Sequence, residues 1–328
     1  MRAAWFDHQG EAVDVLEVGQ AAQPEPGAGE VRVRLTVSGV NPGDVKKRQA
    51  WLDAPMAFPR IVPHSDGAGR IDAVGEGVDP TRVGARVWVF GAQSYRPFGT
   101  AAQATVVPSA QAVDLPDGVG DTLGACLGIP GITAHQAVFG DGEVRGARVL
   151  VHGVLGAVGS LAAQLATWGG ATVIGTVRRG SDVPRVAPGT AAHVVALDQD
   201  DPADVVRGLA PGGVHRVVEV ALAANVDLDA AVIAPDAVIA AYATTSPRTE
   251  IPFWPLLFAN TTLRLLGSDD FPLQAKVRAA ADLTAAAADG ALHVQIGPTF
   301  PLEDIAAAHR AVEAGGPGGR VLLHLPQP

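Results

Sequence analysis

The glycines Gly153, Gly156 and Gly159 are spaced so that their backbone amides could bind an anion. A short apolar run at 149–151 precedes them and indicates a buried strand, and apolar residues within 158–165 recur with the period of a helix. The N–H groups at a helix start are unpaired, and glycines let such a backbone approach a pyrophosphate closely. The sequence therefore predicts a dinucleotide-binding turn. The alternative is a tight strand–helix turn without a ligand.

Two adjacent arginines follow the next expected strand. The strand at 172–177 runs directly into Arg178 and Arg179, with Ser181 close behind. A site for NADH usually has Asp or Glu here, whereas guanidinium groups match a phosphate dianion. We therefore expect the 2′-phosphate of NADPH at this point. The alternative is a solvated basic loop in which Ser181 or Asp182 caps the next helix.

No nucleophile and base occur together at a motif spacing. Cys126 is the only cysteine, and the histidines are scattered along the chain. We expect each histidine to be a surface residue or a satisfied core residue, although His152 stands beside the glycine turn and could contact a cofactor there. Hydride transfer needs no protein nucleophile, because the nicotinamide carries the chemistry. The pattern thus agrees with a nicotinamide-dependent reductase, or with a protein that binds the cofactor without turnover.

Composition limits the class of protein. The 328 residues suffice for about two domains, and nearly half of them are hydrophobic. The net charge of −10 argues against nucleic-acid and membrane-surface partners, which require basic surfaces. The N-terminus lacks the apolar core of a secretion signal, and no apolar run approaches the ~18–20 residues that span a membrane. We expect a soluble cytoplasmic protein with a small-molecule substrate.

Two styles of chain must position these residues. Residues 1–120 contain short strands, among them 31–37, 67–74 and 85–90, separated by Gly and Pro, which indicates a small barrel-like β unit. From about 122 onward strands alternate with helices, which predicts a parallel, doubly wound sheet. The strands expected in that sheet are 149–151, 172–177, 193–197, 216–220, 238–242 and 263–266.

The tail is expected to return to the first unit. Its pattern predicts helices at 274–289 and 302–314 and strands at 293–296 and 320–325. The α/β domain would then be an insertion. The expected boundaries are 1–122 and 268–328 for the β-rich domain and 123–267 for the nucleotide domain. A cleft between two such domains is the default place for a ligand.

Six short segments occur in a set order along the chain. They are 38–44 (SGVNPGD), 63–69 (PHSDGAG), 84–87 (GARV), 128–134 (GIPGITA), 151–159 (VHGVLGAVG) and 319–321 (GRV). In this combination the chain resembles the zinc-independent medium-chain dehydrogenases/reductases of the NADPH:quinone oxidoreductase (zeta-crystallin-like) type. The resemblance covers essentially the whole chain. It implies an α/β fold with a GroES-like β-rich catalytic domain and an inserted Rossmann domain.

The resemblance also implies which residues contact the cofactor. Asn41 and Thr133 match positions near the nicotinamide, and Asn41 would position the ring or the substrate as the catalytic residue. Asn41 could instead form only an Asn-Pro turn, and Arg320 could only cap the glycine-rich turn before it. The full expected cofactor set is Asn41, Thr133, Gly153, Leu155, Gly156, Ala157, Val158, Gly159, Arg178, Arg179, Ser181, Ala221, Tyr242, Ala243, Gly267, Ser268 and Arg320.

Departures from zinc-using relatives set the expectations for metal and substrate. Those relatives have a cysteine at the position of Asn41 and a histidine at that of Ser65, and neither ligand is present. A catalytic zinc needs about three protein ligands, so no metal is expected. For His64 and Asp66 we prefer a hydrogen-bonded turn over a weak metal site. The expected substrate pocket consists of Asn41, Trp51, His64 and Tyr95.

The leading hypothesis is an NADPH-dependent reductase that transfers hydride to a quinone or an α,β-unsaturated carbonyl without a metal. A zinc alcohol dehydrogenase and a non-catalytic NADPH-binding protein, either a sensor or crystallin-like, are the alternatives. Members of the family are usually dimers joined through the sheet edge of the nucleotide domain, which implies a homodimer. The apolar stretch 251–266 could supply that contact or cover the cleft.

Overall fold

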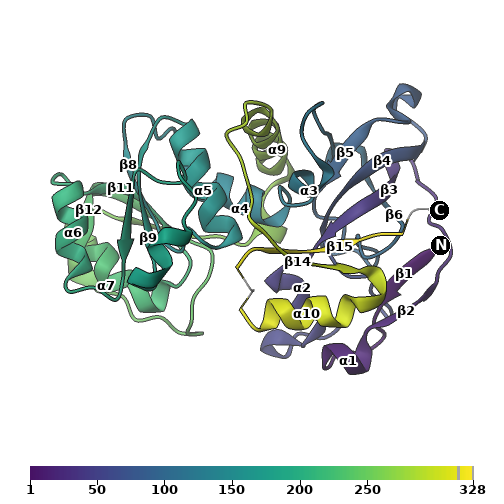
Figure 1. Cartoon of the computed structure of the whole chain (residues 1–328), viewed down its shortest axis with the longest axis horizontal. Coiled ribbons are helices and arrows are strands. Elements are labelled where there is room, and N and C mark those ends of the chain that lie inside the picture. The colour runs from purple at the N-terminus through teal and green to yellow at the C-terminus, as the bar shows by residue number, and fades with distance from the viewer. Residues whose placement is uncertain (316–317, 327–328) are drawn as a thin grey trace. The chain divides into compact units, whose positions relative to one another are not determined.

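The computed structural model describes residues 1–315 and 318–326. The chain forms two compact units. One comprises Met1–Ile129, Lys276–Ala288 and Val294–Pro328, and the other comprises Pro130–Ala275 and Asp289–His293. Each unit has its own main sheet (Figure 1) and its own apolar core.

The first unit is rich in strands. They are β1 (Arg2–Trp5), β2 (Glu17–Gln20), β3 (Glu30–Gly39), β4 (Asp66–Val74), β5 (Arg86–Val89), β6 (Ala104–Pro108), β7 (Ala112–Asp114), β14 (Ile296–Pro301) and β15 (Arg320–His324). The helices are α1 (Ala12–Val15), α2 (Pro42–Arg48), α3 (Asp121–Gly124), most of α9 (Leu273–Ala288) and α10 (Ile305–Glu313). The main sheet has the order β14-β15-β3-β4-β5-β7 with β6 paired to β3, and β1 pairs with β2.

Strand β3 is the centre of this unit. Its alternating apolar residues Val31, Val33 and Leu35 are fully buried in the core, as the period of two in the sequence predicts. The strand pairs antiparallel with β4, β6 and β15. The predicted β-rich GroES-like unit is therefore confirmed.

The tail returns to this unit, as predicted, because β15 pairs antiparallel with β3 and β14 lies parallel beside β15. The strand predicted at 293–296 is wrong, since β14 begins only at Ile296. Instead, the side chain of Gln164 hydrogen-bonds to the backbone of His293. Gln164 Oε1 accepts from the His293 N–H at 2.8 Å, and Gln164 Nε2 donates to the His293 carbonyl at 3.0 Å. The N–H of His293 is thereby used and cannot also donate to a neighbouring strand.

The second unit alternates strands and helices. Its strands are β8 (Arg148–Val151), β9 (Thr172–Val177), β10 (His193–Ala196), β11 (Val214–Glu219), β12 (Ile233–Ala241) and β13 (Thr262–Leu265). Its helices are α4 (Ile129–Phe139), α5 (Ala157–Trp168), α6 (Pro202–Leu209), α7 (Leu222–Val232) and α8 (Phe253–Phe258). All six strands are parallel, in the order β10-β9-β8-β11-β12-β13. The predicted doubly wound Rossmann sheet is confirmed.

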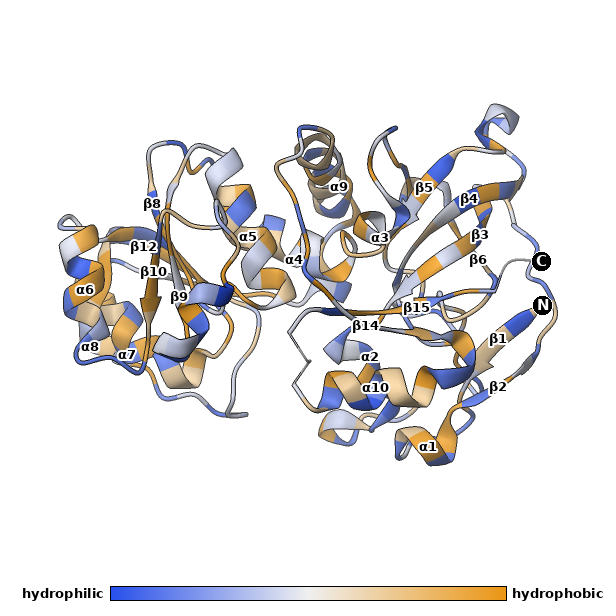
Figure 2. Ribbon diagram, in the orientation of Figure 1, coloured by the Kyte–Doolittle hydropathy of each residue, from blue (hydrophilic) through white to orange (hydrophobic). Residues whose placement is uncertain are grey.

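Helices cover both faces of this parallel sheet. Helix α5 packs on β8 and β9, whereas α6 and α7 pack on β10, β11 and β12, and the two groups lie on opposite sides in Figure 1. The strands are strongly apolar, which Figure 2 shows in orange. A sheet buried on both faces requires such near-continuous apolar strands.

The short helix α8 exposes apolar side chains. Phe253, Trp254 and Phe258 are 56%, 64% and 79% exposed, and Leu265 on the neighbouring edge strand β13 is 71% exposed. These exposed side chains on α8 and β13 form the main apolar surface of this unit.

None of the helices in residues 1–315 and 318–326 combines the length and apolar character needed to cross a membrane.

Candidate cofactor and substrate site

The turn between β8 and α5 requires glycine at two positions. Gly153 has a φ of +69°, in the left-handed region that favours glycine. A Cβ on Gly159 would lie 2.3 Å from the carbonyl oxygen of Gly153, too close for any side chain. Gly156 is the N-cap of the 12-residue helix α5 and offers no side chain to cap it. The first N–H groups of the helix are therefore left for an anion.

The remaining residues of the turn leave its backbone accessible. The Gly156 N–H donates to the Gly153 carbonyl at 2.8 Å and closes the turn. Gly156 is exposed, and Leu155, Ala157 and Val158 are half-buried. This geometry fits a pyrophosphate held by main-chain amides.

The expected 2′-phosphate residues lie directly after β9. Arg178, Arg179 and Ser181 are exposed. In the described part of the chain, neither Arg178 nor Arg179 has an ion-pair partner. The nearby Asp182 instead pairs with Arg185 at 2.7 Å. The arrangement offers two adjacent cations at the surface, which fits a phosphate monoester.

The other expected cofactor residues of this unit follow later strands. Ala221 is the N-cap of α7 after β11, Tyr242 and Ala243 follow β12, and Gly267 with Ser268 follows β13. The carboxyl ends of parallel strands share one edge of a sheet, the edge where nucleotides bind in such folds. Together with the glycine turn and the two arginines, they form one contiguous edge.

Thr133 stands apart from that edge in sequence. It lies in α4, and only 5% of the residue is exposed.

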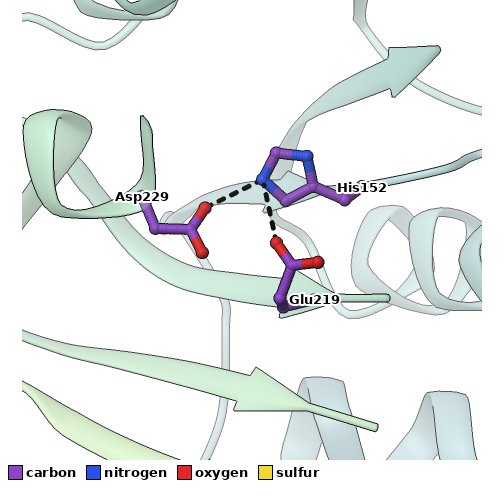
Figure 3. A group of neighbouring side chains, drawn as sticks. All are labelled: His152, Glu219 and Asp229. Carbon is purple, nitrogen blue, oxygen red and sulfur yellow. Dashed lines mark hydrogen bonds and ion pairs between the residues drawn. The ribbon is translucent and has the colours of Figure 1, made fainter. Parts of the chain in front are cut away.

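A buried charged cluster lies next to the glycine turn (Figure 3). His152 Nε2 lies 2.8 Å from Asp229 Oδ1 and 3.5 Å from Glu219 Oε2, and all three side chains are buried. His152 is only 1% exposed and hydrogen-bonded at both ring nitrogens, as a satisfied core histidine is, and it offers a cofactor no surface. Sequence reasoning missed the cluster, although an acid at a strand end and a histidine before a glycine turn were visible.

In the first unit, Asn41 is held from two sides. Its amide oxygen accepts from Arg320 Nη1 at 2.7 Å, and its amide nitrogen donates to Asp66 Oδ2 at 2.7 Å. Arg320 Nη2 also donates to Asp66 Oδ2 at 2.9 Å. Asn41 is thereby fixed and only 3% exposed. Among the described residues Asp66 is the acceptor of its amide nitrogen, which carries a second hydrogen. Arg320 points into this network.

A second carboxyl group lies beside Asn41. Asp44 Oδ2 accepts from the Asn41 N–H at 2.7 Å, which caps the start of α2. Burial raises the pKa of Asp44 to about 7, against the opposing effects of Lys47 and of that hydrogen bond. Asp44 therefore titrates near neutral pH within contact of the expected positioning residue.

His64 belongs to a buried hydrogen-bond chain that the sequence did not reveal. Its Nδ1 lies 2.9 Å from Ser38 Oγ, which lies 2.7 Å from Thr100 Oγ1. Thr100 donates its only hydrogen to the carbonyl of Asp66 at 2.7 Å. Ser38 must therefore donate to Thr100, and His64 Nδ1–H to Ser38. His64, expected in the substrate pocket, is 0% exposed and offers a substrate no surface.

The chain continues on the other side of the ring. His64 Nε2 lies 3.0 Å from His309 Nε2, and Arg48 Nε donates to His309 Nδ1 at 3.4 Å. His309 must then carry its hydrogen on Nε2 and donate it to His64. Both ends of the chain thus require the same tautomers. Arg48 is itself paired with Glu313.

The two aromatic residues expected in the substrate pocket lie on exposed loops. Trp51 is 54% exposed, with the Lys46 ammonium 4.3 Å from the centre of its ring. Tyr95 is 68% exposed and has a positive φ. His64 and Asp66 direct their polar atoms to different partners, in keeping with the hydrogen-bonded turn preferred for them.

A β-rich unit built on β3 and a six-stranded doubly wound unit with a glycine turn define a class: two-domain, dinucleotide-binding oxidoreductases. Residues 27–117 match the alcohol dehydrogenase GroES-like domain, and residues 157–286 match the family described as zinc-binding dehydrogenase. The two matches cover more than half of the chain. The chain belongs to the medium-chain dehydrogenase/reductase family, among relatives of the quinone oxidoreductase type.

Relatives of known name extend over nearly the whole chain. A mouse quinone oxidoreductase is 28% identical over 92% of this chain and 91% of its own length. A rat synaptic vesicle membrane protein VAT-1 homolog is 28% identical over 94% of this chain and 80% of its own length.

Two solved structures share this architecture, and their names mention different cofactors. A structure named NAD-dependent alcohol dehydrogenase is 27% identical, with a TM-score of 0.88 over 99% of this chain and 100% of that chain. A mycobacterial protein complexed with NADPH is also 27% identical, with a TM-score of 0.82 over 99% of both chains.

Proposed function

We propose that this chain is an NADPH-dependent reductase that transfers hydride to a quinone or an α,β-unsaturated carbonyl without a metal. The observation that carries the proposal is the pair of exposed arginines, Arg178 and Arg179, directly after β9, one strand beyond the glycine turn. The NADPH-bound mycobacterial relative and the quinone oxidoreductase relatives support it. The competing cofactor is NADH, the type named for the alcohol dehydrogenase neighbour.

The two parts of the chain would divide the work. Residues 123–267 would hold the cofactor, and residues 1–122 and 268–328 would receive the acceptor. The nicotinamide supplies the hydride when the cofactor is bound. Asn41, oriented by Arg320 and Asp66, would use its remaining amide hydrogen to fix a carbonyl oxygen of the nicotinamide or of the acceptor.

Metal independence rests on the residues at the ligand positions of the zinc-using relatives. Asn41 and Ser65 stand where those relatives place cysteine and histidine. The amide of Asn41 is engaged by Arg320 and Asp66, and an amide held in this way is a poor zinc ligand. Reduction at a fixed nicotinamide then depends on positioning and on excluding water.

The arginine pair provides the test. Replacing Arg178→Ala and Arg179→Ala together should raise the KM for NADPH at least tenfold, because a phosphate dianion loses two charge-assisted donors, and should leave the KM for NADH nearly unchanged. The matched control is Arg185→Ala, an exposed arginine of the same segment that pairs with Asp182. The rate is followed by loss of absorbance at 340 nm with 1,4-benzoquinone or an alkenal.

The same assay separates the alternatives. An equal rise in KM for both cofactors would refute the assignment of the 2′-phosphate. Tight NADPH binding without turnover across quinones and alkenals would favour the non-catalytic NADPH-binding protein. Stoichiometric zinc in the purified protein would refute metal independence.

We also propose that the protein is a cytoplasmic homodimer joined at the edge strand β13. An edge strand presents unpaired backbone groups, and the α8 residues Phe253, Trp254 and Phe258 add exposed apolar area beside it. Replacing Trp254→Ser and Phe258→Ser should convert the dimer to a monomer in light-scattering chromatography. A parent protein that elutes as a monomer would contradict the proposal.

A further inference from the structure

The cluster of His152, Glu219 and Asp229 concentrates charge where the protein has almost no solvent. The three side chains come from the residue after β8, the end of β11 and the middle of α7, and each is at most 1% exposed. Figure 3 shows both carboxylates turned toward one nitrogen of the ring. Buried charges are costly unless they are paired, so the cluster has a specific role in holding this part of the unit together.

The spacing of the atoms in this cluster fits a shared hydrogen better than a bound metal ion. His152 Nε2 and Asp229 Oδ1 are 2.8 Å apart, a hydrogen-bond distance. Two ligands held ~2.1 Å from a tetrahedral ion would lie roughly 3.4 Å apart. Burial lowers the pKa of His152, but the hydrogen bond to Asp229 and the charges of Asp229 and Glu219 outweigh burial and raise the pKa overall.

The second nitrogen of the ring reaches the glycine turn. His152 Nδ1 lies 3.0 Å from Thr176 Oγ1 at the end of β9, and the same hydroxyl accepts from the Gly153 N–H at 3.4 Å. The carbonyl of Thr176 accepts from the Val154 N–H at 3.1 Å. The ring is thus linked through one threonine to the first two residues of the turn.

The carboxylate of Glu219 reaches the start of α7, and its backbone carbonyl reaches the residue after β12. Its Oε1 accepts from the Ala221 N–H and from Asn225 Nδ2, the latter at 3.0 Å. The carbonyl of Glu219 accepts from the Tyr242 N–H at 3.0 Å. The side chains of the cluster therefore tie together the ends of β8, β9 and β11 and the start of α7. These three strand ends carry most of the residues expected to bind the cofactor.

We propose that His152, held between Asp229 and Glu219, is a positioning residue that sets the glycine turn and the start of α7 for NADPH without touching the cofactor. This inference rests on the proposed function and deepens it. Because the ring acts through Thr176 and Gly153, loss of the ring loosens the turn and weakens cofactor binding.

The linkage between proton and cofactor has a defined sign. If the charged ring favours the bound turn, NADPH binding must favour the charged ring by the same factor. The dissociation constant of NADPH should then rise as the pH increases through the raised pKa of His152. The groups facing the ring are Asp229 on α7, Glu219 on β11 and the Thr176 hydroxyl on β9, with Tyr242 behind Glu219.

The experiment measures the Kd of NADPH by calorimetry from pH 6 to pH 9 for the full chain. His152→Gln, which keeps a donor but no charge, should raise the Kd at pH 7 about fivefold or more and remove part of its pH dependence. The 2′-phosphate titrates equally in all variants, so differences between variants report the protein. His193→Gln, at the exposed first residue of β10, is the matched control and should match the parent. The kcat at saturating NADPH should change less than twofold.

A second variant keeps the inference testable if His152→Gln does not fold. Thr176→Val removes the hydroxyl between the ring and Gly153 and leaves every charge in place, and it should raise the Kd several-fold. Far-UV circular dichroism of each variant checks the fold.

Two results would overturn the positioning role while leaving the proposed function intact. One is a Kd and pH profile of His152→Gln and Thr176→Val identical to those of the parent. The other is about one equivalent of metal in the parent that is lost in Asp229→Asn. Failure of the parent itself to bind NADPH would instead refute the proposed function.

Discussion

Two buried histidine clusters, one in each unit, shift the pKa of the same side chain in opposite directions. In the second unit, His152 faces two carboxylates, and its pKa is raised in spite of burial. In the first unit, burial lowers the pKa of His64 well below its usual value, with His309 and Arg320 adding to the effect. Burial and Arg48 lower the pKa of His309 to about 3.

The difference lies in the neighbours, because all three rings are equally buried. The first unit places cations beside its histidines, so these bind each other as neutral donors and acceptors in a chain of fixed direction. The second unit places carboxylates beside its histidine, and these raise the pKa of the ring. The neutral hydrogen-bond chain around His64 orients its side chains at small electrostatic cost. The stability of the cluster of His152, Glu219 and Asp229 depends on each of the three side chains.

The largest expected effect on stability follows from removing a carboxylate from the cluster of His152, Glu219 and Asp229. Asp229→Ala leaves the His152 ring with only Glu219 at 3.5 Å, and breaking a buried ion pair typically costs about 3–5 kcal/mol. Ser38→Ala, a deletion in the neutral chain, should cost about 1–2 kcal/mol. Urea unfolding at pH 7, followed by fluorescence, measures both. A cost for Asp229→Ala no larger than that for Ser38→Ala would contradict the charge assignment.

The second effect sharpens the comparison through pH. A histidine whose folded pKa is lowered binds fewer protons in the folded state, so stability falls as the pH drops below the unfolded pKa of ~6.5. For His309 this loss should reach roughly 3 kcal/mol by pH 4, and His309→Gln should flatten this acid limb. His152 has the opposite sign: its contribution is complete below ~6.5 and is lost as the pH rises through its raised pKa.

The free energy of unfolding from pH 4 to pH 9 tests both signs in one series. His309→Gln should change only the acid limb, and His152→Gln only the alkaline limb. Variants that alter the opposite limbs would show that the two charge states have been assigned the wrong way round.

Local sequence patterns predicted the elements but not these clusters. The glycine turn at 153–159 and the strands around it were visible because strand, turn and helix signals are contiguous. The partners His64 and His309 are 245 residues apart, and His152 and Asp229 are 77 apart. Nothing local to a histidine states which distant group will face it, so neither pairing nor charge could be read from the sequence.

The same limit explains the misplaced strand at 293–296 and the role expected for His64. Gln164, whose side chain hydrogen-bonds to the backbone of His293, lies 129 residues away from it in the sequence. The segment 63–69 does lie beside Asn41, since Asp66 accepts a hydrogen bond from the Asn41 amide. Sequence could not show that the ring of the adjacent histidine turns inward to His309 and Ser38.

The smallest expected effect tests the direction of the neutral chain. Thr100→Val keeps the shape of the side chain but removes the acceptor of Ser38 and the donor to the Asp66 carbonyl, and should cost about 1–2 kcal/mol. Thr100→Ser keeps the hydroxyl and loses one methyl group, at about 1 kcal/mol or less. Thr100→Val should also raise the KM of the acceptor, because Asp66 positions Asn41, whereas Thr100→Ser should not. If the two variants were equal in both stability and KM, the hydroxyl would carry no directed hydrogen bond, and the neutral cluster would differ from the charged one only in packing.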